Sequence, residues 1–509
     1  MTSHTVDAVA TGILAPHPSP VDVAAGHGGV RERQFAFLVN GELRSAAGDA
    51  TYQRVSPFTR NIIATVPHGD VRDADLLADA ADQARRGWAR TPMVERAALV
   101  AKAADLVEAH AEELAYLESI DSGSSLVNSR MDVGLTLQHM RLFAGIALEV
   151  KGATIPASAG LHFTVREPVG VVLRIPAFNH PLMFAGKAFP AIVAGCPVIV
   201  KPPAAAPLST LRLGEILRDV FPPGVLQIAT ASNRGLADAL VRHKHVRRIA
   251  FIGSTSTGLA IQRAASESGY VKEVSLELGG KNAMVVFDDA DVDAAARGAI
   301  AGMNFAWSGQ SCGSNSRLLV QRGIHDRLIE RIAELLKGHR MGDPLDPSTQ
   351  QGTLISEAHF ETVTNYIRIA QDEGARVVVG GERGDDPALG EGLFVPPTVL
   401  TDVPLNGRIA REEIFGPVLA AIPFDDADEA LRIANDSEYG LTASIWTQDI
   451  TRALRFARDI EAGFVWINDS AKHFPNVPYG GVKSSGFGRE ESMEELLSYT
   501  EQKSINVAY

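Results

Sequence analysis

The sequence predicts an α/β fold with two domains, each built around a largely parallel sheet. The chain of 509 residues is too long for one ordinary hydrophobic core. Short runs rich in valine and isoleucine, bounded by glycine or proline, alternate with helical segments, which is typical of parallel sheets. The alternation starts again after residue 277 with the apolar run 283–287, and this restart predicts the second domain.

The predicted elements begin after an irregular stretch. Residues 1–34 mix His, Pro, Gly and Ser without periodicity, so we expect a flexible or loosely docked extension and an ordered chain from Phe35. Alanine-rich faces separated by arginines predict helical structure over residues 74–110. The strands predicted for the first sheet are residues 169–175, 198–200, 225–228 and 249–252.

Two further segments fit neither domain. Residues 150–165 have the pattern of a hairpin, and residues 504–509 have that of a terminal strand. Exposed strands of this kind usually pair with another chain. We therefore expect a homo-oligomer.

Composition narrows the class of protein. Hydrophobic residues make up 45% of the chain and charged residues 21%, which is the balance of a globular protein. A net charge of −13 argues against nucleic acid as a main partner, because phosphate binding needs a basic surface. With two cysteines, a disulfide framework is not expected, and a reducing cytoplasm fits best.

We predict neither a membrane span nor a metal site. The N-terminus lacks the basic start and apolar stretch of a secretory signal. The long apolar stretch 182–200 carries Lys187 and runs into Lys201. A lysine inside lipid is costly, so a buried helix followed by a buried strand explains this stretch better.

Cys312 is a candidate nucleophile. It lies between Gly309 and Gly313, which allow a close approach of the backbone to a ligand and leave the thiol uncrowded. Most free cysteines are instead small buried hydrophobic residues, and Cys196, amid core residues, fits that description.

Glu277 and Asn179 each follow a predicted strand. Glu277 comes after the apolar run 274–276, at the carboxyl end where open α/β sheets bind ligands, although a surface glutamate in a turn has the same pattern. Asn179 follows the strand that ends at Ile175, where its amide is suited to stabilising an oxyanion. A turn-forming asparagine before a proline is the alternative.

Residues 253–258 (GSTSTG) indicate a weak anion site. They follow the predicted strand 249–252 and open a helix, whose N-terminus attracts phosphate. The segment is not a Walker loop, and it lacks the third glycine of the usual dinucleotide fingerprint. Lys187 and Lys201 each interrupt an apolar segment. A lysine in such a place either extends its ammonium group to solvent or holds an anionic ligand.

Taken in order, these motifs closely resemble the aldehyde dehydrogenase superfamily from about residue 36 to the C-terminus. The matching segments are residues 176–181 (PAFNHP), 200–202 (VKP), 251–258 (FIGSTSTG), 276–281 (LELGGK), 309–312 (GQSC), 412–417 (EEIFGP) and 478–490 (PYGGVKSSGFGRE). The resemblance implies homodimers or homotetramers with a small β-structured oligomerisation domain. It assigns residues 1–35 to an N-terminal extension, 36–148 and 169–277 to a cofactor-binding domain, 149–168 and 491–509 to the oligomerisation domain, and 278–490 to a catalytic domain.

The resemblance also implies a reaction, the oxidation of an aldehyde to the carboxylic acid with NAD⁺ or NADP⁺. The Cys312 thiolate would attack the aldehyde, and Asn179 with the Cys312 backbone N–H would stabilise the resulting oxyanion. Glu277 would then activate water to hydrolyse the thioester. Lys187 and Glu490 resemble a family pair that relays the proton away from Glu277.

For the cofactor, the resemblance implies that Lys201 bonds the adenosine ribose, Ser254 the pyrophosphate and Glu413 the nicotinamide ribose, with Phe415 nearby. The other cofactor contacts expected on this basis are Ile175, Pro176, Ala204, Gly253, Leu278 and Gly279.

Two departures from the family pattern carry predictions. Ala204 stands where NAD-dependent members commonly have a glutamate that bonds the ribose and repels a 2′-phosphate. We therefore expect NADP⁺ to be used at least comparably to NAD⁺, with help from Arg234 in the altered loop 230–235. Gly186 stands where many members carry tryptophan, which predicts space for bulky or aromatic aldehydes. The predicted walls of this pocket are Phe178, Trp307 and Phe474.

Three other interpretations compete. A CoA-acylating member typically lacks a base at the position of Glu277. A non-catalytic protein on the same scaffold is disfavoured by the intact set of Cys312, Glu277 and Asn179. A cysteine hydrolase needs a histidine that activates Cys312, and none of the fourteen histidines lies in a motif of that kind. The physiological aldehyde is not specified by these residues.

Overall fold

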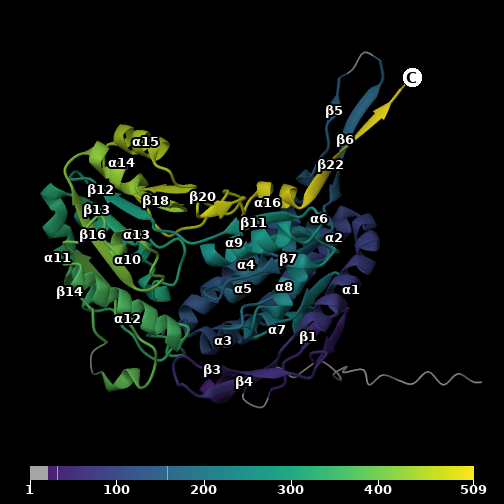
Figure 1. Cartoon of the computed structure of the whole chain (residues 1–509), viewed down its shortest axis with the longest axis horizontal. Helices are drawn as coiled ribbons and strands as arrows, with labels where there is room; N and C mark the ends of the chain where they lie inside the picture. The colour runs from purple at the N-terminus through teal and green to yellow at the C-terminus, as the bar shows by residue number, and fades with distance from the viewer. Residues whose placement is uncertain (1–20, 31–32, 157–158, 384–385, 509) are drawn as a thin grey trace, which may run out of the picture.

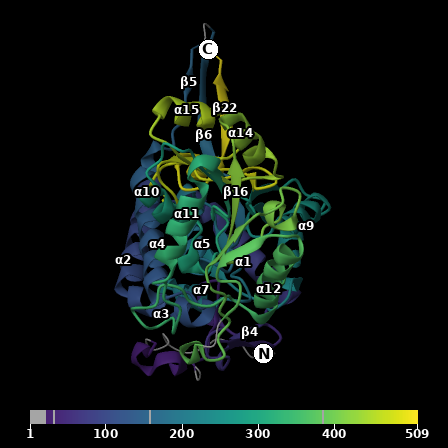
Figure 2. The same ribbon diagram turned by 90° about the vertical axis from the view of Figure 1, so that its left-hand side faces the viewer.

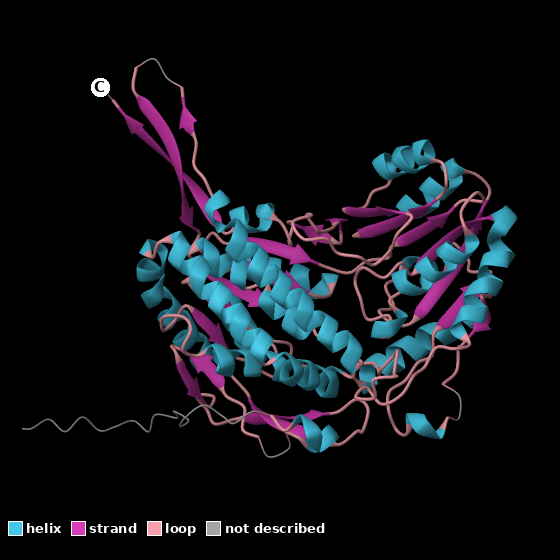
Figure 3. Ribbon diagram, turned by 180° about the vertical axis from the view of Figure 1, so that it is seen from behind, coloured by secondary structure: helices cyan, strands magenta, loops and turns pink. Residues whose placement is uncertain are grey.

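The computed structural model describes residues 21–30, 33–156, 159–383 and 386–508 of the chain. They form two α/β lobes side by side, with a narrow arm of strands projecting from the first lobe (Figure 1). Figure 3 shows helices covering the strands of both lobes. The predicted α/β class with two sheets is confirmed.

The first lobe contains an eight-stranded sheet in the order β2-β1-β9-β8-β7-β10-β11-β21. Its central strands β9, β8, β7, β10 and β11 run parallel, and the antiparallel strands β1 and β21 flank them. The strands are β1 (Phe37–Val39), β2 (Glu42–Arg44), β7 (Val171–Ile175), β8 (Val198–Val200), β9 (Leu226–Ile228), β10 (Val246–Ile252), β11 (Glu273–Glu277) and β21 (Gly486–Phe487). The apolar runs therefore predicted the central strands to within three residues at each end.

Helices surround this sheet, and a separate hairpin lies at the bottom of the first lobe in the view of Figure 1. The helices are α1 (Val71–Arg90), α2 (Met93–Ala109), α3 (Ala111–Ser122), α4 (Leu126–Ile146), α5 (Pro181–Gly186), α6 (Phe189–Ala194), α7 (Leu208–Leu217), α8 (Gly235–Arg242) and α9 (Thr255–Ser266), and the hairpin is β3 (Thr51–Val55) with β4 (Ile62–Pro67). The helical segment predicted over residues 74–110 is two helices, because the chain breaks at Pro92, and the residue before a proline avoids the helical region.

The apolar stretch 182–200 forms α5, α6 and β8, all buried in the first lobe. This agrees with the predicted buried helical segment followed by a buried strand. Within the described part of the chain, no helix is both long enough and apolar enough to cross a membrane.

The second lobe has a seven-stranded sheet in the order β14-β15-β16-β13-β12-β18-β19. Successive residues of β12 point into different apolar clusters: Ala283 and Val285 into one, Met284 and Val286 into the other. Both faces of this sheet are therefore covered, which explains why its strands are continuously apolar. The strands are β12 (Ala283–Val286), β13 (Arg317–Gln321), β14 (Arg376–Val379), β15 (Thr398–Thr401), β16 (Val418–Phe424), β18 (Thr442–Trp446) and β19 (Phe464–Ile467).

The helices of the second lobe are α10 (Val292–Gly302), α11 (His325–Leu336), α12 (Glu357–Asp372), α13 (Arg408–Arg411), α14 (Ala427–Asn435) and α15 (Ile450–Asp459). A small pair, β17 (Tyr439–Gly440) and β20 (Val482–Lys483), lies between the lobes and precedes β21 of the first sheet. The end of the chain therefore returns from the second lobe to the first.

The arm consists of β5 (Thr154–Ile155), β6 (Leu161–Pro168) and β22 (Thr500–Val507), with α16 (Met493–Ser498) at its base. β6 pairs antiparallel with both of the others. The predicted hairpin and terminal strand are thus present, and they belong to one sheet. Figure 2 shows the arm at the opposite end of the molecule from β4.

Residues 21–30 already pack against the first lobe, before the predicted ordered start at Phe35. Val21 and Val30 are buried, and the Val21 backbone N–H donates to Glu113 of α3 at 2.8 Å. A short 3₁₀ helix, Val23–Gly28, lies between them. The expectation for residues 1–20 lies outside the described residues.

Candidate active site

Cys312 lies in a tight loop that follows the 3₁₀ turn Phe305–Trp307. Gly309 has a φ of +65°, and a Cβ there would lie 2.2 Å from the Gly416 carbonyl oxygen, so only glycine fits. The Cys312 carbonyl accepts a hydrogen bond from Asn282 Nδ2 at 2.7 Å. These contacts fix the backbone that carries the thiol. The thiol-bearing residue packs against an apolar cluster that contains Tyr479.

The two cysteines differ as predicted in burial. Cys196 is fully buried, and its Sγ donates to the Tyr499 carbonyl at 3.4 Å, whereas Cys312 is partly exposed. Burial and the nearby carboxylates of Glu277 and Glu413 raise the pKa of Cys312 to about 12. The Cys312 thiol is therefore protonated at neutral pH in this state, and it needs a base or a nearby cation to become a thiolate.

Glu277 ends β11, at the carboxyl edge of the first sheet, and only 6% of its surface is exposed. Burial and the charge of Glu490 raise the pKa of Glu277 to about 8. Its Oε1 has no hydrogen-bond partner among the described residues. A carboxylate with a raised pKa and a free oxygen is suited to accept a proton.

Lys187 lies at the C-terminal end of α5, fully inside the first lobe. Its Nζ lies 3.9 Å from Glu277 Oε2, 2.7 Å from Glu490 Oε2 and 3.1 Å from Glu491 Oε1. The predicted neighbours Lys187, Glu490 and Glu277 are thus brought together. Glu491 was missed, although the sequence holds two consecutive glutamates there.

Glu490 is also held by the buried side chain of Arg174, whose two terminal nitrogens both bond its carboxylate. Burial alone would raise the pKa of Glu490, but Arg174 and Lys187 lower it to about 2. Glu490 is therefore a permanent anion at physiological pH.

Asn179 is buried in the loop between β7 and α5, at the same edge of the sheet as Glu277. Its neighbour His180 is within hydrogen-bond distance of Asp132 of α4, with His180 Nδ1 2.8 Å from Asp132 Oδ2. This pair was not predicted, because 48 residues separate its members and no motif connects them.

Several of the residues predicted to bind the cofactor lie at the carboxyl edge of the first sheet. Ser254 follows β10 and is the N-cap of α9, and its side chain accepts from the Thr257 N–H, so this helix begins at the carboxyl edge. Gly253 donates to the Glu277 carbonyl at 3.0 Å. Ile175, at the end of β7, is buried, as are Pro176 and Leu278.

Lys201 follows β8 and is 8% exposed. Burial lowers the pKa of its ammonium group to about 8, which indicates that the protein places little negative charge beside this cation. Tyr52 lies beside Ala204, and its hydroxyl donates to the Ala204 carbonyl at 3.4 Å. Arg234, by contrast, is an exposed residue at the start of α8.

Glu413 comes from the second lobe and reaches the first. Its carboxylate accepts from the Gly280 N–H at 2.8 Å, and burial raises its pKa to about 7. A Cβ at Gly279 would lie 2.2 Å from Glu413 Oε2, so Gly279 permits this approach. The aligned helix terminus, the buried cation and this carboxylate have the chemistry to hold the phosphate and ribose groups of a dinucleotide.

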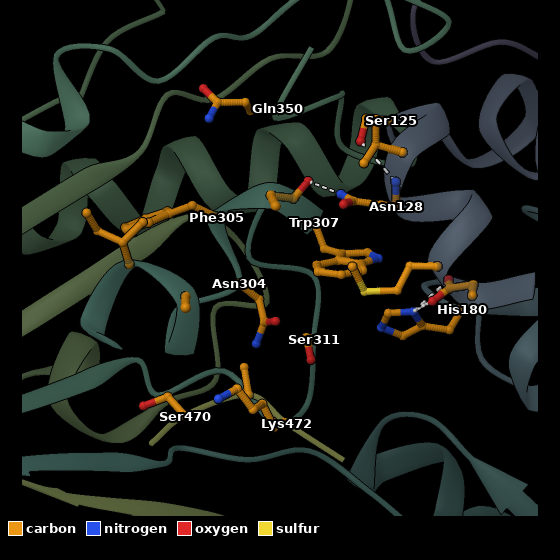
Figure 4. A pocket seen from close by; sticks show the side chains of 18 of the residues that line it. Ser125, Asn128, His180, Asn304, Phe305, Trp307, Ser311, Gln350, Ser470 and Lys472 are labelled. Atoms are coloured by element: carbon orange, nitrogen blue, oxygen red, sulfur yellow. Dashed lines mark hydrogen bonds and ion pairs between the residues drawn. The ribbon is translucent and has the colours of Figure 1, made fainter. Parts of the chain in front are cut away.

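A cavity of about 730 Å³ opens beside Cys312 and is lined by both lobes. Ser311 and Gly313, the two neighbours of Cys312, contribute to its wall. Figure 4 shows Ser311 there. His180 and Trp307 lie together there, with ring centroids 5.7 Å apart. Further lining residues include Asn128, Asp132, Met183, Asn304, Phe305, Trp466, Ser470, Lys472 and His473.

Of the four predicted pocket residues, Trp307 lines this cavity, but Phe178, Gly186 and Phe474 are not among the described residues that line it. Phe178 packs against Phe415, with ring centroids 5.7 Å apart, and Phe474 is 43% exposed. The prediction of open space beside Gly186 is wrong. A Cβ there would lie 2.7 Å from Thr136 Cγ2, so Thr136 of α4 fills the gap.

The partly exposed Cys312 and the raised-pKa carboxylate of Glu277 lie together at the carboxyl edge of a parallel sheet, which is where α/β enzymes bind their ligands. The family model that matches is "Aldehyde dehydrogenase family", over residues 44–505. The aldehyde dehydrogenase tropH of Talaromyces stipitatus is 44% identical and the alignment covers 97% of this chain and 96% of that protein. The hydroxyisobutyraldehyde dehydrogenase of Mycolicibacterium austroafricanum is 39% identical, over 92% of this chain and 93% of that protein.

Solved structures agree. A putative aldehyde dehydrogenase from Burkholderia cenocepacia has a TM-score of 0.91 and 40% identity, covering 93% of this chain and 97% of that one. An NAD⁺ complex of an aldehyde dehydrogenase from Bacillus cereus has a TM-score of 0.91 and 36% identity, covering 96% of this chain and 100% of that one. The chain belongs to the aldehyde dehydrogenase family, and it is an NAD(P)-dependent aldehyde dehydrogenase.

Proposed function

We propose that this enzyme oxidises bulky or aromatic aldehydes to carboxylic acids by way of a thioester on Cys312, which is hydrolysed by water that Glu277 activates. The observation that carries the proposal is the state of Glu277 beside Cys312: buried, with a pKa of about 8 and one unbonded oxygen. A carboxylate of that kind exchanges protons near neutral pH, as a hydrolytic base must. A CoA-acylating enzyme has no use for such a base.

The proposed steps use this chain's own groups. Glu277 takes the Cys312 proton, and the sulfur adds to the aldehyde carbon to form a thiohemiacetal. The Asn179 amide and the Cys312 backbone N–H donate to the oxyanion that develops. When bound, the nicotinamide dinucleotide supplies the hydride acceptor that makes this oxidation possible. After Glu277 has passed the Cys312 proton to solvent, it deprotonates a water whose oxygen attacks the resulting thioester and releases the acid and the Cys312 thiolate.

For the cofactor, we propose that Lys201 holds the adenosine ribose, Ser254 at the start of α9 the pyrophosphate, and Glu413 the nicotinamide ribose. Support comes from the burial of Lys201 without an ion pair among the described residues and from the N-terminus of α9 at the sheet edge. Ala204 provides no carboxylate against a 2′-phosphate. We propose that NADP⁺ is accepted at least comparably to NAD⁺.

The proposed preference for bulky or aromatic aldehydes rests on the cavity, because Thr136 fills the space beside Gly186. A volume of about 730 Å³ accommodates far more than acetaldehyde, and Trp307 and Trp466 provide aromatic surfaces in its wall. A panel of aromatic, short aliphatic and long aliphatic aldehydes, with reduced cofactor followed by absorbance, tests the proposal. Higher kcat/KM for aromatic members supports it, and equal values for acetaldehyde and benzaldehyde contradict it. Acyl transfer to CoA in place of water would contradict the hydrolytic step.

We also propose that the enzyme is a cytoplasmic homodimer or homotetramer joined through the arm. The domain division expected from the sequence is proposed with it, residues 149–168 and 491–509 forming the oligomerisation unit. The outer residues of β22 are largely exposed, which supports pairing of this strand with another chain. Light scattering on the full chain and on a variant truncated before residue 500 tests this. A wild-type monomer contradicts the proposal.

A further inference from the structure

His473 lines the substrate cavity and reaches back toward the catalytic carboxylates. Its Nδ1 lies 2.9 Å from Glu491 Oε2, and its side chain is 31% exposed. Glu491 itself is buried, and its other oxygen, Oε1, accepts from Lys187 Nζ at 3.1 Å. A continuous series of polar groups therefore links Lys187 to the cavity.

The same lysine lies 3.9 Å from Glu277 Oε2. Together these contacts form a chain from Glu277 through Lys187 and Glu491 to His473. We propose that the proton taken from the hydrolytic water leaves the active site along this chain and enters the substrate cavity from the His473 imidazole. The inference rests on the proposed role of Glu277 as the hydrolytic base.

The alternative partner of Lys187 is less suited to carry the proton onward. Glu490 is bonded at both oxygens by Arg174, and a guanidinium does not release a proton in proteins. A proton that reached Glu490 could therefore not pass through Arg174 to another side chain. Glu491, in contrast, is followed by an imidazole, which accepts a proton on one nitrogen and releases one from the other.

The water O–H bond breaks, the oxygen bonds the thioester carbon, and the proton goes to Glu277. Lys187 takes that proton as it gives one of its own to Glu491. Glu491 receives the proton at Oε1 and, after its carboxyl group turns, passes it to Nδ1 of the His473 imidazole, which releases the proton on Nε2 to water in the cavity. Proton exchange with the cavity water then restores the hydrogen on Nε2. Each group then returns to its starting charge.

Several other charged groups face this chain from neighbouring elements. His139 of α4 is buried and interacts with Glu491, Lys187 and His473, and burial lowers its pKa to about 4. It is therefore neutral in the working range of pH. Burial would raise the pKa of Glu491, but Lys187 and His473 hold it well below its usual range. Glu490 and Arg174 add one charge of each sign, and the Tyr479 ring lies 4.6 Å from that of His473.

A second way out is a smaller cavity of about 260 Å³ behind the base. It is lined by Glu277, Glu490 and Glu495 and does not involve His473. If protons leave through water in this cavity, changes at His473 will leave hydrolysis intact.

The test replaces His473 with glutamine, which keeps a hydrogen bond to Glu491 but cannot carry a proton. We expect His473→Gln to keep the initial burst of reduced cofactor and to slow acid formation by about tenfold or more. Added imidazole should restore much of the rate, and the pH profile of hydrolysis should change shape. His325→Asn is the matched control, because His325 Nδ1 lies 2.8 Å from the exposed Asp326 and outside the cavity.

The outcomes separate this inference from the proposed function. Aldehyde oxidation near the wild-type rate in Cys312→Ala would reject the thioester mechanism itself. A normal burst with wild-type hydrolysis in His473→Gln would overturn the relay and favour the smaller cavity. Slow hydrolysis that imidazole does not restore, with an unchanged pH profile, would show a structural role and would also overturn it.

Discussion

Glu277 Oε2 lies 3.9 Å from the Nζ of Lys187, whereas Glu277 Oε1 has no hydrogen-bond partner among the described residues. One oxygen is therefore oriented by a buried cation, and the other is available to a water or a thiol. Burial and the neighbouring Glu490 keep the pKa of this carboxyl near 8 despite the lysine. This arrangement underlies the first three predictions.

Replacing the nucleophile tests the covalent step. Cys312→Ala should abolish aldehyde oxidation and leave cofactor binding nearly intact, because the thiol forms the bond to substrate but does not hold the dinucleotide. Steady-state turnover and a cofactor-binding titration measure the two effects. Cys196→Ala is the control, since Cys196 is buried against Tyr499, and it should alter stability modestly and turnover little. Oxidation near the wild-type rate in Cys312→Ala would reject the mechanism.

Replacing the base should separate the two halves of the reaction. Glu277→Gln keeps the shape of the side chain but cannot accept a proton from water. Because Glu277 also takes the Cys312 proton, thioester formation should slow as well, but less than hydrolysis, so about one equivalent of reduced cofactor per active site should form first, followed by little turnover. Stopped-flow absorbance measures the burst amplitude. Normal turnover in this variant would mean that another group is the base.

The raised pKa of Glu277 predicts the pH dependence of hydrolysis. The carboxylate must be deprotonated to act as a base, so the rate should rise with pH and level off above about pH 8. Below that value it should fall by roughly tenfold per pH unit, as the protonated fraction grows. Decay of a preformed thioester, measured by mixing it into buffers between about pH 6 and about pH 10, isolates this step. A flat profile over that range would contradict the assignment.

Much of this site was accessible from the sequence because local patterns carry it. The Val- and Ile-rich runs predicted the parallel strands, and Glu277 and Asn179 follow two of them, so the sheet brought them to the same edge. The resemblance supplied their expected roles. What sequence could not supply were pairs between distant elements, such as His180 with Asp132 and Glu491 with His473.

The wrong prediction at Gly186 has the same origin. The absence of a side chain at Gly186 does not leave open space. Protein interiors are closely packed with few voids, so a residue from another helix takes up the volume. Thr136 lies 50 residues earlier in the chain, and nothing in its local pattern indicates which residue it faces.

The contact between α4 and α5 can be tested directly. Gly186→Ala places a methyl group 2.7 Å from Thr136 Cγ2, so we expect a loss of about 1–3 kcal/mol in the free energy of unfolding. Denaturant titration measures it. Thr136→Ser removes the methyl group in question, and in that background the loss should be smaller. Equal losses in both backgrounds would show that Thr136 is not the obstacle.

The choice of cofactor rests on a single absent charge. A glutamate at position 204 would accept hydrogen bonds from the adenosine ribose and repel a 2′-phosphate, and Ala204 does neither. A charge-assisted hydrogen bond contributes about 1.5–3 kcal/mol, which corresponds to roughly 10- to 150-fold in affinity. Ala204→Glu should therefore shift the ratio of kcat/KM values toward NAD⁺ by about that factor.

Ala204→Gln is the matched control, because it adds a similar volume without the charge. It should leave the use of NADP⁺ closer to that of the wild type than Ala204→Glu does. Removing Lys201 by Lys201→Met should weaken binding of NADP⁺ more than of NAD⁺, since its buried ammonium is the cation proposed to meet the phosphate. A wild-type enzyme that prefers NAD⁺ by about a hundredfold would contradict the prediction, because losing the carboxylate would then have changed too little to admit the phosphate.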